Sequence, residues 1–143
     1  MVLDSSLSWL ALTLTPGVAS RLSARLLREF GAPEDVFRAP LQRLEACNLP
    51  APVAQALYKK DAFKRAEKEL ATARRIGCRL INWSDPEYPH SLLQIYDPPV
   101  LLYVRGDAQT LNLPSLGIVG TRRPTIYGST MAERLGCSRT CDR

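Results

Sequence analysis

The spacing of apolar residues changes at Gly77, and this change limits the folds that the chain can adopt. Before Gly77, apolar side chains recur every three to four residues, as in SRLSARLLREF at 20–30, which is typical of amphipathic helices. After it, the compact apolar runs at 78–83 and 100–106 are separated by proline-rich turns, which is typical of strands. The sequence therefore predicts an α + α/β protein, in which a small helical domain precedes the beginning of a parallel sheet.

Two domains and a short tail are expected. Helical spacing predicts a first domain over residues 1–57, and the strands predict a second over 58–136. Within the second domain, LPSLGIVG at 113–120 is expected to form a third strand, followed by a helix from about Thr125 or Gly128. The tail at 137–143, CSRTCDR, is polar and has no periodicity.

A helix-hairpin-helix pattern is present in LTLTPGVASRLSARLL at 12–27. The free amides at the start of its second helix could bind a phosphate oxygen, because they and the helix dipole both favour an anion. Alternatively, Pro16-Gly17 only connects two helices that pack together.

Composition and charge narrow the class of protein. The chain has 143 residues, 45% of them hydrophobic, and a formal net charge of +5, which favours a polyanionic partner. Residues 59–79 hold eight basic and three acidic side chains and so account for the net charge; they predict either a solvated helix with ion pairs or a DNA-facing helix.

Other patterns exclude several kinds of site. The four cysteines lack the spacing of a disulfide framework or a zinc site, and a reducing cytoplasm suits them. The apolar run LSWLALTL at 7–14 is too short to span a membrane. A single histidine, His90, and scattered carboxylates predict no catalytic residue, no metal site and no cofactor.

The stretch GIVGTRRPTIYG at 117–128 holds the strongest candidate for a binding site. It lacks both the GxGxxG dinucleotide pattern and the Walker pattern. Instead, residues 121–127 provide two hydroxyls, two guanidinium groups and a phenol, which suit a sugar-phosphate strand with an unpaired base. The other interpretation is that the arginines are solvated and that Tyr127 packs at a helix start.

The order of motifs resembles the DNA-processing protein A family, DprA/Smf. The matching pieces are PGV and LLREFGAPEDVF, then DPEYPHSLLQIYDPPVLLYVRGD, then LGIVGTRRPTIYG. The resemblance covers about residues 7–136 and implies a sterile-alpha-motif-like (SAM-like) or helix-hairpin-helix domain, followed by a Rossmann-like domain that binds single-stranded DNA.

The family's function is carried by a glycine-hydroxyl-arginine turn that contacts DNA phosphates. The resemblance implies a non-enzymatic protein of natural transformation that loads a RecA-type recombinase, with a possible homodimer and no membrane partner. Carried over to this chain, the residues expected to bind the nucleic acid are Gly120, Thr121, Arg122, Arg123, Thr125, Tyr127 and Gly128.

The chain departs from the family after Gly136. Family members continue with further strands and a glycine-rich segment, so a truncated chain with an incomplete sheet and impaired function is expected. Two alternatives stay open: a phosphoribohydrolase-like enzyme that processes nucleotides, and a helical protein-interaction module confined to residues 1–57.

Overall fold

The computed structural model describes residues 5–137 of the chain. These divide into two compact units, Met1–Leu113 and Pro114–Arg143, hereafter unit 1 and unit 2. Helices and a small sheet occur together, which confirms the expected mixture of α and β structure. The expected boundary between a helical domain at 1–57 and a second domain at 58–136 stays a prediction.

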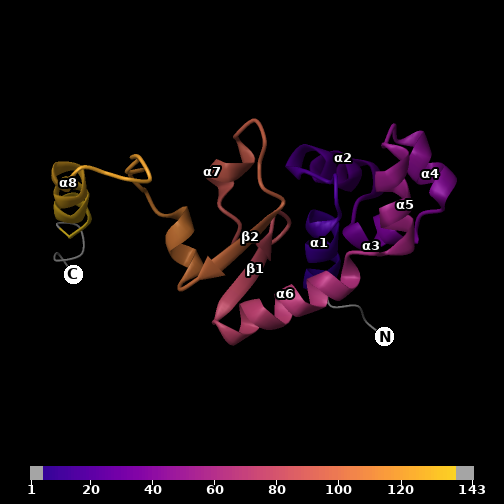
Figure 1. The fold of residues 1–143 in the computed structure, drawn as a ribbon, viewed down its shortest axis with the longest axis horizontal. Helices are drawn as coiled ribbons and strands as arrows, with labels where there is room; N and C mark the ends of the chain where they lie inside the picture. The colour runs from indigo at the N-terminus through magenta and orange to yellow at the C-terminus, as the bar shows by residue number, and fades with distance from the viewer. Residues whose placement is uncertain (1–4, 138–143) are drawn as a thin grey trace. The chain divides into compact units, whose positions relative to one another are not determined.

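Unit 1 begins with six helices connected by short turns (Figure 1). Gly17, between the first two helices, has a φ of +81°, and Gly31 ends the second with a φ of +87°. The Gly31 N–H donates to the Leu27 carbonyl at 2.9 Å, so Gly31 forms the C-terminal cap of this helix. The helices are α1 (Ser5–Leu14), α2 (Ser20–Phe30), α3 (Pro33–Arg38), α4 (Leu41–Ala46), α5 (Ala51–Lys59) and α6 (Phe63–Arg75).

A two-stranded sheet follows α6. Strands β1 (Cys78–Asn82) and β2 (Leu101–Arg105) lie where the sequence predicts them, with α7 (His90–Leu93) between them and a 3-10 helix, η1 (Ala108–Asn112), after them. The predicted parallel pairing is wrong, since Cys78 faces Arg105 and Asn82 faces Leu101 in an antiparallel register. For parallel pairing, the connection between the strands must carry the chain back to the start of the first strand, usually through a long helix. The one-turn helix α7 is too short to do this.

One hydrophobic core joins the helices of unit 1 to its sheet. It includes Leu10 and Leu12 of α1, Leu70 of α6 and Val100 next to β2. The Trp9 and Trp83 rings meet edge to face with centroids 6.4 Å apart. Figure 1 shows α6 running beside α1 and into β1, so the sheet is held against the helical part by apolar packing.

Unit 2 consists of an irregular segment at 114–125 and helix α8 (Ile126–Cys137). The helix is predicted correctly, but the third strand at 113–120 is not formed. Val119, expected inside a sheet, is 95% exposed. A strand needs a neighbour to pair its N–H and C=O groups, and the described residues offer this segment none.

Candidate nucleic-acid interface

The arginine-rich turn lies immediately before α8. The Thr121 hydroxyl donates to the Arg123 carbonyl at 2.9 Å and closes the turn. The Gly128 N–H donates to Thr125 Oγ1 at 3.2 Å, so Thr125 caps the helix N-terminus. Two of the predicted binding residues thus shape the backbone in addition to offering hydroxyl groups.

A cavity of about 660 Å³ opens within this part of unit 2. Five of the seven predicted residues line it, and Ile118, Val119 and Ala132 add apolar surface. Arg122 and Tyr127 do not line it; both side chains are exposed, and Tyr127 is 74% exposed. The five lining residues are Gly120, Thr121, Arg123, Thr125 and Gly128.

Glycine leaves room for a ligand at one position and for the cap at another. A Cβ added to Gly120 would meet no atom within 4 Å, so the backbone there is open to an approaching group. A Cβ added to Gly128 would lie 3.4 Å from Thr125 Oγ1, close to the capping hydrogen bond. The first glycine therefore allows close approach to the backbone, and the second keeps the helix start uncrowded.

The turn has a positive charge that its surroundings do not neutralise. Residues 114–132 contain no acidic side chain, and the nearest following one, Glu133, accepts a hydrogen bond from the Ser129 hydroxyl at 3.4 Å. Within residues 5–137, neither Arg122 nor Arg123 forms an ion pair. Two guanidinium groups beside a helix N-terminus favour a phosphate or another anion.

The remaining candidates were His90 and the scattered carboxylates. In the described part of the chain, no three His, Cys, Asp or Glu side chains are grouped so as to hold a metal ion. The exposed His90 starts α7, where its backbone N–H donates to Asn112 Oδ1 at 3.3 Å. None of the helices within 5–137 has the length and apolar character needed to cross a membrane.

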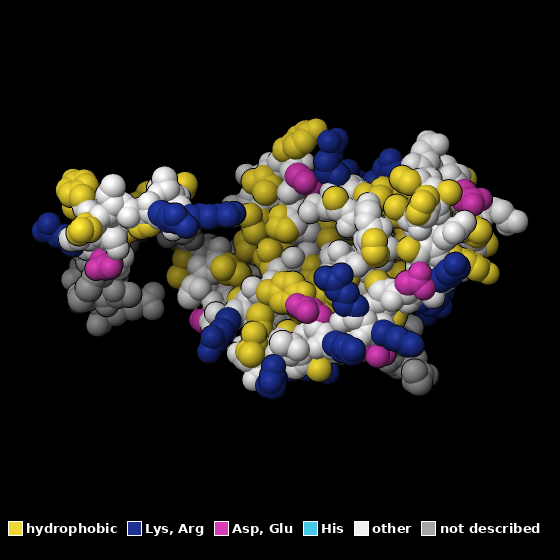
Figure 2. All heavy atoms as spheres, in the orientation of Figure 1, with side chains coloured by type: hydrophobic (Ala, Val, Ile, Leu, Met, Phe, Trp, Pro, Cys, Tyr) yellow, Lys and Arg dark blue, Asp and Glu magenta, His cyan; other side chains and the backbone are white. Residues whose placement is uncertain are grey.

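The basic segment at 59–79 forms α6 and the turns beside it. Figure 2 shows its Lys and Arg side chains along one exposed edge of unit 1, with Asp and Glu side chains between them. The exposed residues include Lys64, Lys68 and Arg75, whereas Ala66, Leu70 and Ala73 face the core. The mixture of charges keeps the solvated-helix interpretation open beside the DNA-facing one.

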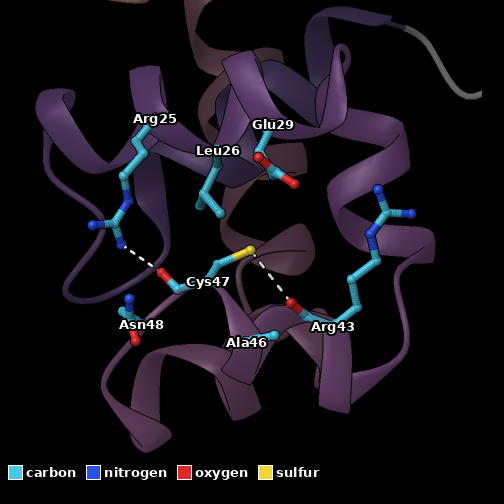
Figure 3. Close-up of a pocket in the computed structure, with 7 residues that line it drawn as sticks. All are labelled: Arg25, Leu26, Glu29, Arg43, Ala46, Cys47 and Asn48. Atoms are coloured by element: carbon cyan, nitrogen blue, oxygen red, sulfur yellow. Dashed lines mark hydrogen bonds between the residues drawn. The ribbon is translucent and has the colours of Figure 1, made fainter.

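A second group of arginines, which the sequence alone did not single out, lies in unit 1. Arg25 of α2 and Arg43 of α4 line a cavity of about 300 Å³ (Figure 3). The Arg25 Nη2 donates to the Cys47 carbonyl at 2.9 Å, and the Arg43 guanidinium lies 4.8 Å from the centroid of the Phe30 ring. The four-residue spacing of Arg21 and Arg25 was the only sequence signal, because Arg43 reaches the group through the fold.

Comparison with known proteins shows what the segment around the turn is similar to. Residues 79–141 match the family model of DNA recombination-mediator protein A. The DNA processing protein DprA of Bacillus subtilis (strain 168) is 39% identical over 74 residues, which cover 51% of this chain and 25% of that protein. The Protein Smf of Synechocystis sp. is 27% identical over 132 residues, which cover 89% of this chain and 33% of that protein.

A third relative has the same name as the first. The DNA processing protein DprA of Streptococcus pneumoniae is 37% identical over 51 residues, which cover 36% of this chain and 18% of that protein. No solved structure matches the chain. The chain thus spans between about a fifth and a third of the length of these curated relatives. The chain is similar to proteins of the DprA/Smf family, and the segment that matches the family model contains the arginine-rich turn.

Proposed function

We propose that this chain is part of a single-stranded-DNA-binding protein that processes DNA in recombination or natural transformation. The observation that carries the proposal is the cavity at the start of α8, which five of the seven predicted residues line, together with two arginines that form no ion pair within residues 5–137. It lies inside the segment that matches DNA recombination-mediator protein A. The names of the relatives, DNA processing proteins, support the same role.

The proposed mechanism is electrostatic and tolerant of sequence. Backbone N–H groups at Gly120 and the Arg122 and Arg123 side chains hold successive phosphates, and Tyr127 stacks on an unpaired base. No bond is made or broken, so the protein acts without catalysis. Binding releases counterions from the strand and therefore weakens as salt rises.

The finer assignments of the family belong to this proposal. Residues 1–57 would form the SAM-like or helix-hairpin-helix domain, 58–136 the first part of a Rossmann-like domain, and 137–143 a divergent tail. A RecA-type recombinase would be the protein partner, a homodimer the assembly, and the cytoplasm the location. The support is the similarity of the chain to proteins of the DprA/Smf family.

Substitution of Arg122 tests the proposed function. Arg122→Ala in the whole chain should weaken binding of a fluorescent oligo-dT, measured by anisotropy, by about tenfold, because a charge-assisted hydrogen bond contributes roughly 1.5–3 kcal/mol. The slope of log affinity against log salt should fall by about 0.7 for each lost phosphate contact.

Arg38→Ala is the matched control. It removes the same charge from unit 1, where Arg38 pairs with Asp35 at 3.5 Å, and should leave affinity nearly unchanged. Equal affinity and equal salt slope for Arg122→Ala and the unchanged chain would overturn the assignment of the turn. The absence of any oligo-dT binding by the unchanged chain would overturn the function itself.

A further inference from the structure

We infer that unit 1 carries a second contact surface for single-stranded DNA, separate from the turn before α8. This surface, hereafter the arginine–tyrosine surface, consists of Arg21 and Arg25 of α2, Arg43 of α4, and Tyr96 in the loop between α7 and β2. The choice of single-stranded DNA as its ligand rests on the proposed function, but the residues of this surface are different from those of the turn.

Tyr96 and Arg21 meet across a long separation in sequence. The Tyr96 side chain is 86% exposed, and the Arg21 guanidinium carbon lies 5.2 Å from the centroid of its ring. Figure 2 shows hydrophobic and basic side chains next to each other on unit 1, between α7 and α2 at the top of the view. An exposed ring with a guanidinium over one face is a suitable platform for an unpaired base, because the other face of the ring is left to stack on it.

The three arginines are held by neutral groups instead of acids. Arg21 lies on the Tyr96 ring, Arg25 donates to the Cys47 carbonyl, and Arg43 lies on the Phe30 ring. Within residues 5–137, none of the three forms an ion pair. Their guanidinium groups are therefore positioned and keep their full charge, so less conformational entropy is lost when phosphate binds.

Arg21, Arg25 and Arg43 line two hollows that have Arg25 in common. Arg21 and Arg25 are one helical turn apart, about 6 Å along the axis of α2, and both line a hollow of about 330 Å³ with Leu22. Arg25 also lines the neighbouring 300 Å³ cavity with Arg43. Arg21 and Arg25 thus offer two guanidinium groups along α2 and Arg43 a third across the cavity, so a strand can contact them while a base stacks on Tyr96.

Acidic side chains near this surface oppose its use: Asp97 is exposed directly after Tyr96, and Glu29 lies on α2. Glu29 points into the same cavity as Arg43 in Figure 3, without forming an ion pair there. Its negative charge repels phosphate, so Glu29→Gln should strengthen binding of DNA. An acidic protein partner would also use the arginines, but it would gain little from the exposed ring face, which is why the observations favour single-stranded DNA.

Photocrosslinking of the whole chain locates the contact directly. Oligo-dT carrying 5-iododeoxyuridine is bound and irradiated, and the crosslinked peptides are identified by mass spectrometry. We expect one crosslink on the peptide that contains Tyr96 and another on the peptide that contains Tyr127. A crosslink at Tyr127 alone would overturn this inference and support the proposed function, and a crosslink at Tyr96 alone would do the reverse.

Affinity measurements separate stacking from simple charge attraction. Tyr96→Ala should weaken oligo-dT binding by about fivefold or more, since stacking on one base contributes roughly 1–3 kcal/mol. Tyr96→Trp should retain affinity, Arg21→Ala should weaken it, and Arg38→Ala should not change it. If Tyr96→Ala leaves affinity unchanged while Arg21→Ala lowers it, the surface attracts anions without stacking, as an acidic protein would require, and the inference is wrong.

Discussion

Gly17 shows how one residue sets the angle between the first two helices. Its φ of +81° lies in the left-handed region, and a Cβ added there would lie 2.7 Å from Cγ2 of Val53. Val53 is itself buried in the core, so it has little room to move. Both the backbone conformation and the close contact therefore require glycine at this position.

We expect Gly17→Ala to lower the free energy of unfolding by about 2–5 kcal/mol, the sum of a left-handed backbone penalty and an overpacking penalty. Urea denaturation followed by the fluorescence of the core tryptophans measures it. Gly31→Ala is the control, since Gly31 has a φ of +87° but no atom within 4 Å of the added Cβ. Equal destabilisation by the two substitutions would contradict the proposed contact with Val53.

The residues of the candidate sites were predictable to different degrees. Pro16-Gly17 was recognisable as a turn, and the composition of 117–128 together with the family resemblance singled out the seven residues expected to bind nucleic acid. The spacing of Arg21 and Arg25 was visible too. What the sequence could not show were the partners from distant segments: Val53 against Gly17, Tyr96 against Arg21 and Phe30 against Arg43. These contacts depend on how helices pack, which local spacing does not encode.

At the scale of elements, helices were easier to predict than the sheet. Helical spacing and glycine caps mark the ends of α2 and α6 within the sequence itself. The apolar runs locate β1 and β2 correctly, but the direction of pairing depends on the path of the connection at 83–100. The segment 113–120 has the composition of a buried strand, yet a strand forms only where a neighbour pairs with it.

The hydroxyl of Tyr88 forms a hydrogen bond within the segment that connects β1 and β2. Tyr88 is 1% exposed, and its hydroxyl donates to the Pro99 carbonyl at 2.6 Å. Burial raises the pKa of Tyr88 above its ordinary value of 10.0. The unfolded chain therefore loses this proton at a lower pH than the folded chain does, so the stabilisation is complete below pH 10 and is lost as the pH rises through the raised pKa.

We expect Tyr88→Phe to lower the free energy of unfolding by about 1 kcal/mol at pH 8, the typical contribution of a hydrogen bond. Above pH 10 the loss of stability should be shallower in the variant than in the unchanged chain. Tyr103, whose pKa is raised by burial and by Glu69, remains in both and provides the common background. Urea denaturation between pH 8 and 11 measures the difference, and parallel pH profiles would disprove the role of Tyr88.

At the scale of the molecule, the two units differ in what stabilises them. Unit 1 has a shared core of helices and sheet, with buried residues from Trp9 to Val100. In unit 2, no residue between 114 and 136 is buried, and exposed apolar side chains include Leu116, Val119 and Ile126. The free energy of local opening should therefore be much lower at 114–125 than in unit 1.

This difference predicts the order of tryptic cleavage. Within residues 5–137, the first cut should follow Arg122, because the turn is exposed and lacks regular structure, whereas Lys64 and Arg65 lie in a helix packed on the core. The bond after Arg123 should resist, since Pro124 follows it. Mass spectrometry of a time course identifies the sites.

The same digestion reports on binding, since a strand held by the turn covers the bond after Arg122. Saturating oligo-dT should slow that cut by about the ratio of total to free protein, because only the free turn is open to the protease. Cleavage at Arg74 and Arg75, near the end of α6, should keep its rate. If oligo-dT slows both regions equally, the protection is a general effect of the polyanion on trypsin. If α6 is cut before the turn, unit 1 is the less stable part, and the assignment of stability to its shared core is wrong.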